Sequence, residues 1–325
     1  MTRATVIGAG VAGLCVASEL VARGCAVTVF DPVPQPGPHH CSWWAGGMLA
    51  PFCEGEAAEE PVVRLGQQAA GWWERQGVSV TRRGTVVVTL NRDRRELDRF
   101  ARRTEGHTRL DAAALAALEP DLAGRFDQAL HVTDEAHLDP RAALRHLRAR
   151  LEGDGVSFVA EPGRGDGLTF DCRGLAARDA FPDLRGVKGE MAVLRAPDIN
   201  LSRPVRLLHP RFPLYVVPRA DGHFMLGATQ IESDDRRRRV RSVLELLSAA
   251  YALHPVFGEA ELVEIGADAR PAFPDNLPRL IRRGETIHVN GLFRHGFLLA
   301  PALARMAVDM ACDRGKPEFY HADHG

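Results

Sequence analysis

The chain has 325 residues, 45% of them apolar and 26% charged, with 41 Lys and Arg against 42 Asp and Glu. These proportions are those of an ordinary globular protein of about two domains, and the formal charge of -1 excludes the strongly basic surface of a general nucleic-acid or membrane-surface binder. The six cysteines form no C-x-x-C pair and no run of 18 apolar residues occurs, so we expect a cytoplasmic protein without a metal site or transmembrane helix, whose partner is a small molecule.

The N-terminal segment has the pattern of a βαβ unit. Residues 4–7 are a short apolar run that predicts a buried strand, and they lead directly into residues 8–13, which have the spacing G-x-G-x-x-G. A helical pattern follows as far as Arg23-Gly24, and a second strand, Ala26–Phe30, ends at Asp31. The segment therefore predicts a dinucleotide site.

Each part of this unit has a physical role. Gly8 permits the tight turn, Gly10 lets the backbone approach a pyrophosphate, and Gly13 lets the helix pack close to the sheet. Asp31 can accept hydrogen bonds from a ribose 2′-hydroxyl, and its charge argues against NADP. The pattern does not separate FAD from NAD.

The rest of the chain alternates between loops, helices and strands. A proline-rich loop leads to residues 39–51, whose glycines would let the backbone pass close to a flat ligand; the adjacent His39, His40 and Cys41 lack the spacing of a metal site. Helices are predicted over residues 62–76, 94–103, 141–151 after an Asp139 N-cap, from Arg236 after Asp234-Asp235, and 298–312. Strands are predicted over residues 84–90, 156–159, 189–194, 215–218, 224–229 and 286–290, and the arginine run 236–239 is expected to be a solvated helix face.

Five segments resemble the D-amino-acid oxidase superfamily, and within it the thiamine-pathway glycine oxidases. They are residues 6–14 (VIGAGVAGL), 42–51 (SWWAGGMLAP), 214–219 (LYVVPR) with 226–229 (LGAT), 269–271 (ARP) with 274–278 (PDNLP), and 291–301 (GLFRHGFLLAP). The resemblance implies an α/β fold of the glutathione-reductase type. It implies a Rossmann-like FAD-binding domain made of residues 1–80, 138–188 and 265–325, and a β-rich substrate domain made of residues 81–137 and 189–264.

The resemblance also implies the cofactor and its contacts. The cofactor is expected to be noncovalent FAD, because residues 291–301 hold no cysteine for the covalent link of some sarcosine oxidases. The helix that starts near Gly296 is expected to direct its dipole at the flavin. The residues expected to contact FAD are Gly8, Gly10, Val11, Ala12, Gly13, Asp31, Ser42, Gly46, Gly47, Met48, Val159, Gly174, Gly296, Phe297, Leu298 and Leu299.

The implied activity is the oxidation of glycine, with sarcosine and small D-amino acids as further substrates. Arg270 is expected to hold the substrate carboxylate, Tyr215 to assist it, and Arg294 to be a second active-site arginine, while His295 is either polar packing or a proton carrier. Dioxygen would be the acceptor, and the imine product would feed thiazole synthesis for thiamine. A flavin dehydrogenase, an NAD-linked dehydrogenase and a non-catalytic FAD-binding subunit stay open, as does a homo-oligomer.

One departure from the family pattern lies after the strand that ends at Val159. Only 11 residues separate Val159 from Asp171, too few for the three-stranded meander of these flavoproteins, and Cys172-Arg173-Gly174 replaces the usual A-T-G. The meander is therefore predicted to be reduced to a loop.

Overall fold

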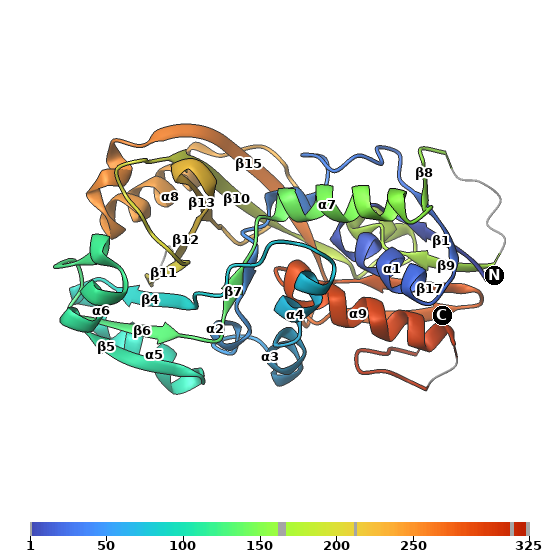
Figure 1. Ribbon diagram of the computed structural model, residues 1–325, viewed down its shortest axis with the longest axis horizontal. Helices are drawn as coiled ribbons and strands as arrows, with labels where there is room; N and C mark the ends of the chain where they lie inside the picture. The colour runs from blue at the N-terminus through green and yellow to red at the C-terminus, as the bar shows by residue number, and fades with distance from the viewer. Residues whose placement is uncertain (1, 162–166, 211–212, 313–314, 323–325) are drawn as a thin grey trace.

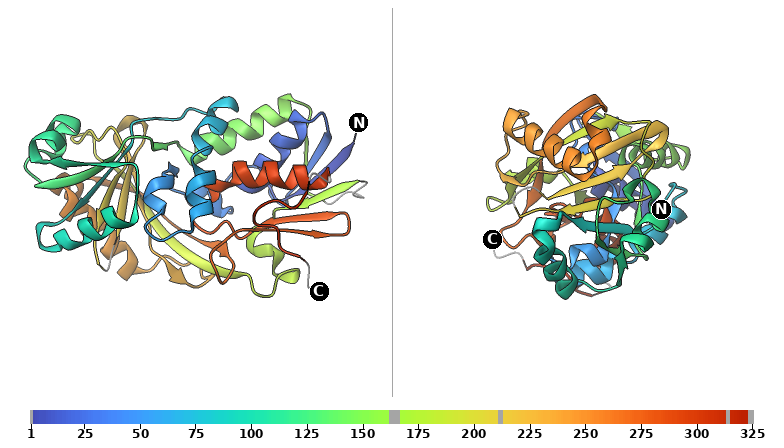
Figure 2. Two further views of the ribbon diagram at one scale, coloured as in Figure 1. Left: turned by 90° about the horizontal axis from the view of Figure 1, so that it is seen from below. Right: turned by 90° about the vertical axis from the view of Figure 1, so that its left-hand side faces the viewer.

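The computed structural model describes residues 2–161, 167–210, 213–312 and 315–322. Its strands form a six-stranded sheet, a nine-stranded sheet and a two-stranded ribbon. The two large sheets lie end to end along the long axis of the molecule, the six-stranded sheet on the right in Figure 1. Figure 2 shows the same elongated arrangement from below. No helix among the described residues is long and apolar enough to span a bilayer.

The six-stranded sheet is built around the predicted βαβ unit. Its order is β16 (Arg279–Arg283), β17 (Thr286–Asn290), β9 (Leu168–Asp171), β1 (Arg3–Ile7), β2 (Ala26–Phe30) and β8 (Ser157–Val159). All neighbours are parallel except β16 and β17, which form a hairpin. Parallel pairing requires crossover connections, and α1 (Val11–Ala22) supplies the one between β1 and β2.

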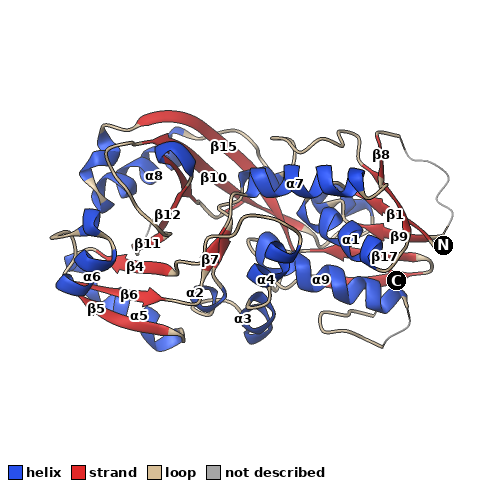
Figure 3. Ribbon diagram, viewed as in Figure 1, coloured by secondary structure: helices blue, strands red, loops and turns tan. Residues whose placement is uncertain are grey.

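Helices α1, α7 (Pro140–Gly153) and α9 (Gly296–Ala311) lie against this sheet (Figure 3). The face of α9 that carries Leu299, Leu303 and Ala307 is fully buried, because side chains four residues apart stand one above the other on a helix. Burying each leucine contributes roughly 1.5–3 kcal/mol. Asp139 caps α7 by accepting hydrogen bonds from the backbone N–H groups of Arg141 and Ala142, as predicted.

The nine-stranded sheet is mostly antiparallel. Its order is β14 (Ile231–Glu232), β10 (Arg185–Arg195), β13 (His223–Gly227), β12 (Leu214–Pro218), β11 (Val205–Leu208), β4 (Thr85–Thr89), β6 (Gln128–Val132) and β5 (His107–Asp111), and β15 (Glu261–Ala272) also pairs with β10. Helices α5 (Arg94–Arg103), α6 (Ala112–Leu118) and α8 (Val240–Leu253) lie around it (Figure 3).

Short elements join the two sheets. They are the ribbon strands β3 (Met48–Leu49) and β7 (Ala136–His137), and the helices α2 (Pro51–Glu54), α3 (Glu60–Gly66) and α4 (Ala69–Arg75). The long strands β10 and β15 run from the nine-stranded sheet toward the six-stranded one (Figure 1). Both strands cross boundaries of the predicted domains, at 188/189 and 264/265, and those boundaries stay a prediction.

Two predicted helices are wrong in part. The predicted helix 62–76 is two helices, α3 and α4, that meet at Gln67 and Gln68. Gly66 ends α3 where it packs against α9: a Cβ atom at Gly66 would lie 2.8 Å from Cγ of Leu298. The predicted continuous helix is therefore interrupted at the point where the chain packs closely against α9.

The predicted helix from Arg236 is also wrong, because residues 234–239 form no helix and α8 begins at Val240. Their backbone N–H and C=O groups form hydrogen bonds with side chains and not with one another along a helix. The N–H of Arg237 donates to Asp235 Oδ1 at 2.8 Å, and the N–H of Arg239 donates to Glu190 Oε1 at 3.0 Å. The Lys188 ammonium donates to the carbonyl of Arg237. The arginine run is thus tied to β10 and is not a solvated helix face.

Other strands carried too little signal to be predicted. The strands without a counterpart among the predicted elements are β5, β6, β11, β14, β15 and β16, together with the ribbon strands β3 and β7. Of the segment between β8 and β9, where a reduced loop is predicted, residues 162–166 lie outside the described residues.

Candidate active site

A cavity of about 760 Å³ lies between the two sheets, within the size range of ligand pockets. One end is lined by the turn after β1 and by Asp31 at the end of β2. The other end is lined by Tyr215 of β12, Arg270 of β15 and Arg294, which precedes α9. The predicted nucleotide and substrate groups therefore share one continuous space.

Glycines shape the nucleotide end. Gly8 has φ +104°, and a Cβ atom there would lie 2.7 Å from the carbonyl oxygen of Cys172. A Cβ atom at Gly13 would lie 1.8 Å from the carbonyl oxygen of Gly8, which is how the first turn of α1 packs onto the strand end. A Cβ atom at Gly10 meets nothing closer than 3.5 Å, so this backbone is open to the cavity.

The Asp31 carboxylate is tied to the same turn. Its Oδ2 accepts hydrogen bonds from the backbone N–H of Ala9 at 2.8 Å and from His40 Nε2 at 2.9 Å, and its Oδ1 accepts one from the N–H of Val33. Burial raises the pKa of Asp31, but these donors outweigh burial and leave the pKa below its ordinary value. The group is therefore a charged acceptor beside the opening of α1.

Asp31, His39 and His40 also form a cluster whose possible metal-ligand atoms lie within 4.8 Å of one another, the one such group in the described part of the chain. His40 Nε2 is hydrogen-bonded to Asp31, and His39 Nε2 lies 3.0 Å from the carbonyl oxygen of Val33. These atoms have protein partners, and the absence of a metal site stays a prediction.

The loop before β3 forms the middle of the cavity. Ser42 Oγ accepts a hydrogen bond from the N–H of Val11 at 3.1 Å, which joins this loop to the start of α1. Gly46 faces Tyr215, since a Cβ atom there would lie 2.6 Å from the ring. The guanidinium of the half-buried Arg219 donates to the carbonyl of Gly46 at 2.6 Å and so holds the loop in place. Desolvation lowers the pKa of Arg219 to about 10.

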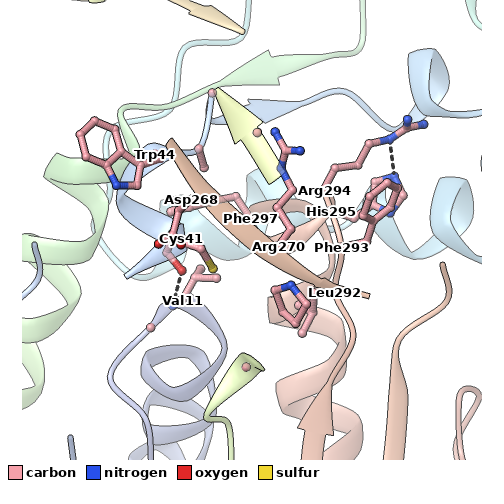
Figure 4. A pocket seen from close by; sticks show the side chains of 18 of the residues that line it. Val11, Cys41, Trp44, Asp268, Arg270, Leu292, Phe293, Arg294, His295 and Phe297 are labelled. Atoms are coloured by element: carbon pink, nitrogen blue, oxygen red, sulfur yellow. Dashed lines mark hydrogen bonds between the residues drawn. The ribbon is translucent and has the colours of Figure 1, made fainter. Parts of the chain in front are cut away.

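At the substrate end, Arg270 is half-buried on β15, on the strand that also carries Asp268 (Figure 4). Its Nη1 donates to the carbonyl of Thr229 at 3.3 Å, and no carboxylate pairs with it among the described residues. Burial lowers the pKa of Arg270, and the neighbouring Arg294 lowers it further. Burial raises the pKa of the Tyr215 hydroxyl, which keeps it protonated at neutral pH.

A second group of charges, centred on Glu54 at the end of α2, lines the same end. Glu54 Oε2 accepts hydrogen bonds from Arg294 Nε at 2.7 Å and His295 Nε2 at 2.9 Å, and its Oε1 accepts one from Arg206 Nη2 at 3.3 Å. Burial raises the pKa of Glu54, but Arg294, His295 and Arg206 outweigh it and hold the pKa well below its usual range. Arg294 and His295 lie together in Figure 4.

The cavity collects most of the predicted site residues. Arg270, Tyr215 and Arg294 line it, as do all the predicted FAD contacts except Gly13, Val159 and Leu299. Gly13 packs on Gly8, and Leu299 is fully buried on α9. The carbonyl of Val159 accepts the N–H of Asp31 at 3.1 Å, so Val159 supports a lining residue without lining the cavity itself.

Several lining residues were not predicted, among them Glu54, Arg206 and Cys41. Glu54 follows the predicted flavin loop in the sequence, which is the one signal that could have drawn attention to it. Arg206 lies on β11, a strand that the sequence did not reveal.

Comparison with known proteins gives consistent matches over nearly the whole chain. The family model described as FAD dependent oxidoreductase matches residues 3–310. The chain is 54% identical over 323 residues to the "Putative thiamine biosynthesis oxidoreductase ThiO" of Rhizobium etli, covering 97% of this chain and 98% of that protein. It is 27% identical to the glycine oxidase of Pseudomonas aeruginosa, covering 96% and 95%. The crystal structure of glycine oxidase from Geobacillus kaustophilus superposes with a TM-score of 0.80 at 22% identity, covering 98% and 97%.

Proposed function

The chain belongs to the family of FAD-dependent oxidoreductases, and on that premise we propose that it oxidises glycine, with dioxygen as the electron acceptor. The overall reaction converts glycine, dioxygen and water to glyoxylate, ammonia and hydrogen peroxide. The relatives named as glycine oxidase and as a thiamine biosynthesis oxidoreductase support this substrate and a role in supplying thiazole formation.

The cavity residues fit FAD. The left-handed backbone at Gly8 and the open backbone at Gly10 leave room for a pyrophosphate at the start of α1, where N–H groups and the helix dipole favour anions. Asp31 would bind the adenosine ribose through Oδ1, which accepts one hydrogen bond, from the N–H of Val33, and can accept another. Gly46, Gly47 and the start of α9 would flank the flavin ring. When bound, FAD supplies the acceptance of two electrons and their transfer to dioxygen.

The observation that carries the choice of substrate is the unpaired Arg270. A guanidinium that is half-buried and has no carboxylate partner among the described residues is a site for a carboxylate, which it can grip through two parallel hydrogen bonds. The Tyr215 hydroxyl would donate a third bond to the same carboxylate. Together they would fix the substrate α-carbon in one orientation, and orientation is a large part of catalysis for so small a molecule.

Local packing leaves little room around these two side chains. A Cβ atom at Gly189 would lie 2.1 Å from Nη2 of Arg270, and one at Gly227 would lie 2.4 Å from the Tyr215 hydroxyl oxygen. Both groups are therefore held in place by backbone. The positive charge of Arg270, which no described carboxylate balances, would favour the neutral form of a bound amine over its ammonium form.

The test is to record the visible spectrum of the purified protein and add glycine without oxygen. Loss of the oxidised flavin absorbance, followed by one hydrogen peroxide per flavin when oxygen is admitted, would support the proposal. No loss with glycine, sarcosine or D-alanine would contradict it. Loss of absorbance without peroxide would point instead to a flavin dehydrogenase that uses another acceptor.

A further inference from the structure

Helix α8 has two apolar faces, and the described structure covers only one of them. Leu246, Ala250 and Leu253 are buried against the nine-stranded sheet. On the outer side, Val240 is 77% exposed, Leu244 59% and Tyr251 58%. These are the three most exposed large apolar side chains among the described residues.

The spacing of the outer residues is that of a helix-pairing seam. Val240, Leu244, Leu247 and Tyr251 follow one another at steps of four, three and four residues. Leu247 is half-buried, because part of it packs against the inner core, and it lies at the edge of the outer face. Alternating steps of four and three residues keep a narrow apolar stripe facing a second helix. A helix face that meets only water has no need of this pattern.

The seam is accessible to a partner. In Figure 1, α8 lies at the left-hand end of the molecule, away from the six-stranded sheet, and Figure 2 shows it at the surface when that end faces the viewer. The chain continues from α8 through a short turn, Pro255–Gly258, to Leu262 and Val263 at the start of β15, which are 44% and 46% exposed. Two further apolar side chains are thus exposed shortly after the helix in the chain.

We propose that α8 pairs in an antiparallel manner with α8 of a second copy of this chain, about a two-fold axis. This arrangement would place Val240 against the partner's Tyr251, and Leu244 against the partner's Leu247. A two-fold contact requires a surface that complements itself, and a symmetric 4-3-4 seam meets that requirement.

The charges at the two ends of α8 favour the antiparallel orientation. The amino end of α8 keeps an excess of positive charge, since residues 232–241 hold five arginines against three acidic residues. Arg237 pairs with Asp235 and Arg241 lies 3.9 Å from Glu245, but their side chains are 77% and 83% exposed. Beyond the carboxyl end stand the exposed Glu259 and Glu261. An antiparallel pair brings each basic end toward the partner's acidic end and also opposes the two helix dipoles, whereas a parallel pair would bring like charges together.

The size of the surface predicts a dimer that depends on concentration. One helix face with two further side chains is smaller than the roughly 800 Å² per partner of a standard stable interface. Analytical ultracentrifugation of the FAD-loaded protein over a concentration series tests this, with a reductant present because Cys312 is exposed. We expect the mass to rise toward twice that of one chain.

Charged substitutions in the seam should abolish the rise. Leu244→Glu and Tyr251→Glu should each weaken self-association by at least about tenfold, without loss of FAD or of amine oxidation, since α8 contributes no residue to the large cavity. Ala117→Glu, the same change of charge on the exposed side of α6, is the matched control and should leave the dimer intact.

Three results would overturn the proposal. One is a wild-type protein that stays monomeric up to about 100 μM, the weak end of specific association. Another is a dimer that Leu244→Glu leaves unchanged. The third is a monomer that binds anionic phospholipid vesicles and loses that binding in Leu244→Glu, which would assign the seam to a membrane surface.

Discussion

Arg270 is a cation whose charge no described carboxylate balances, although the side chain is half-buried. Most arginines in this chain have such a partner; Arg294 and Arg206, for example, share Glu54. Removing a charge from water costs free energy unless a partner compensates. A binding site can retain such a cost, because the ligand provides the missing partner.

Arg270→Ala should therefore lower kcat/KM for glycine by at least about two orders of magnitude, equivalent to roughly 3 kcal/mol. Arg270→Lys should restore only part of the loss, because an ammonium cannot form two parallel bonds to a carboxylate. Steady-state peroxide assays measure both. Flavin content is the control and should match the wild type. Turnover within a few-fold of the wild type in an Arg270→Ala protein with its full FAD content would place the carboxylate site elsewhere, with Arg294 as the next residue to test.

Glu54 is expected to position Arg294 and Arg206 and not to react itself. Glu54→Gln keeps the shape but removes the charge from two arginine contacts, each worth about 1.5–3 kcal/mol when charged. We expect KM for glycine to rise by about tenfold or more with a smaller change in kcat, since the arginines stay present but lose their fixed orientation. The exposed Glu60, which pairs with Arg64, provides the control: Glu60→Gln should change neither constant. Equal effects of the two substitutions on KM would contradict the positioning role assigned to Glu54.

At the scale of elements, the turn between β1 and α1 contains one glycine that is needed for folding and another that is needed for binding. Gly13 is close-packed within the protein, whereas Gly10 faces open space. The two glycines of one motif therefore serve different purposes.

Gly13→Ala should destabilise the FAD-free protein by about 3 kcal/mol or more, because its Cβ atom would overlap the carbonyl of Gly8. Gly10→Ala should leave the FAD-free protein near wild-type stability but weaken FAD binding by at least about 100-fold. Urea unfolding without FAD and titration with FAD make the comparison. The assignment fails if Gly10→Ala binds FAD as the wild type does.

Strand β9 is held at its end by a buried ion pair that depends on pH. Burial raises the pKa of Asp171, but the contacts with His288 and Arg173 outweigh it and lower the pKa to about 2. The ordinary value is 3.8, and the difference of about 1.8 corresponds to about 2 kcal/mol. Because the folded-state pKa is depressed, this stabilisation is fully present above the unfolded-state pKa and is lost as the pH falls toward the folded-state pKa.

Asp171→Asn should consequently lower the free energy of unfolding by about 2 kcal/mol at pH 7, and the difference from the wild type should shrink below pH 4. Urea denaturation between pH 3 and 7, without FAD in either sample, measures it. A difference that stays constant over this range would show that the charge of Asp171 is not its source.

At the scale of the whole molecule, FAD would contact both sheets, because the cavity is lined from each of them. A ligand that binds only the folded chain adds RT ln(1 + [L]/Kd) to its stability, about 2.7 kcal/mol at 100 times Kd. We expect this increase in urea unfolding for the wild type and for Arg270→Ala. Gly10→Ala should show almost none at the same FAD concentration, and an equal increase in that variant would contradict the placement of the pyrophosphate.

The sequence by itself determined the parts of this protein whose signals are local. Strand β1, helix α1 and strand β2 follow one another within the first 30 residues, and hydrophobic periodicity with three glycines is sufficient to predict them. Helix α5 was predicted with its observed ends, and the Asp139 cap of α7 depends on neighbours two and three residues away. The five family segments likewise brought Arg270, Tyr215 and Arg294 to one site.

Only the tertiary structure decided which distant groups meet. Glu54, Arg206 and Arg294 belong to α2, β11 and the turn before α9, and 152 and 240 residues separate Glu54 from its two partners. The arginine run 236–239 has the composition of a helix face, but Glu190 and Lys188 of β10 bind its backbone groups, and the run is not helical. Local propensity is worth less than about 1 kcal/mol per residue, whereas buried charged contacts and close packing are worth more, so partners that are remote in the chain override it.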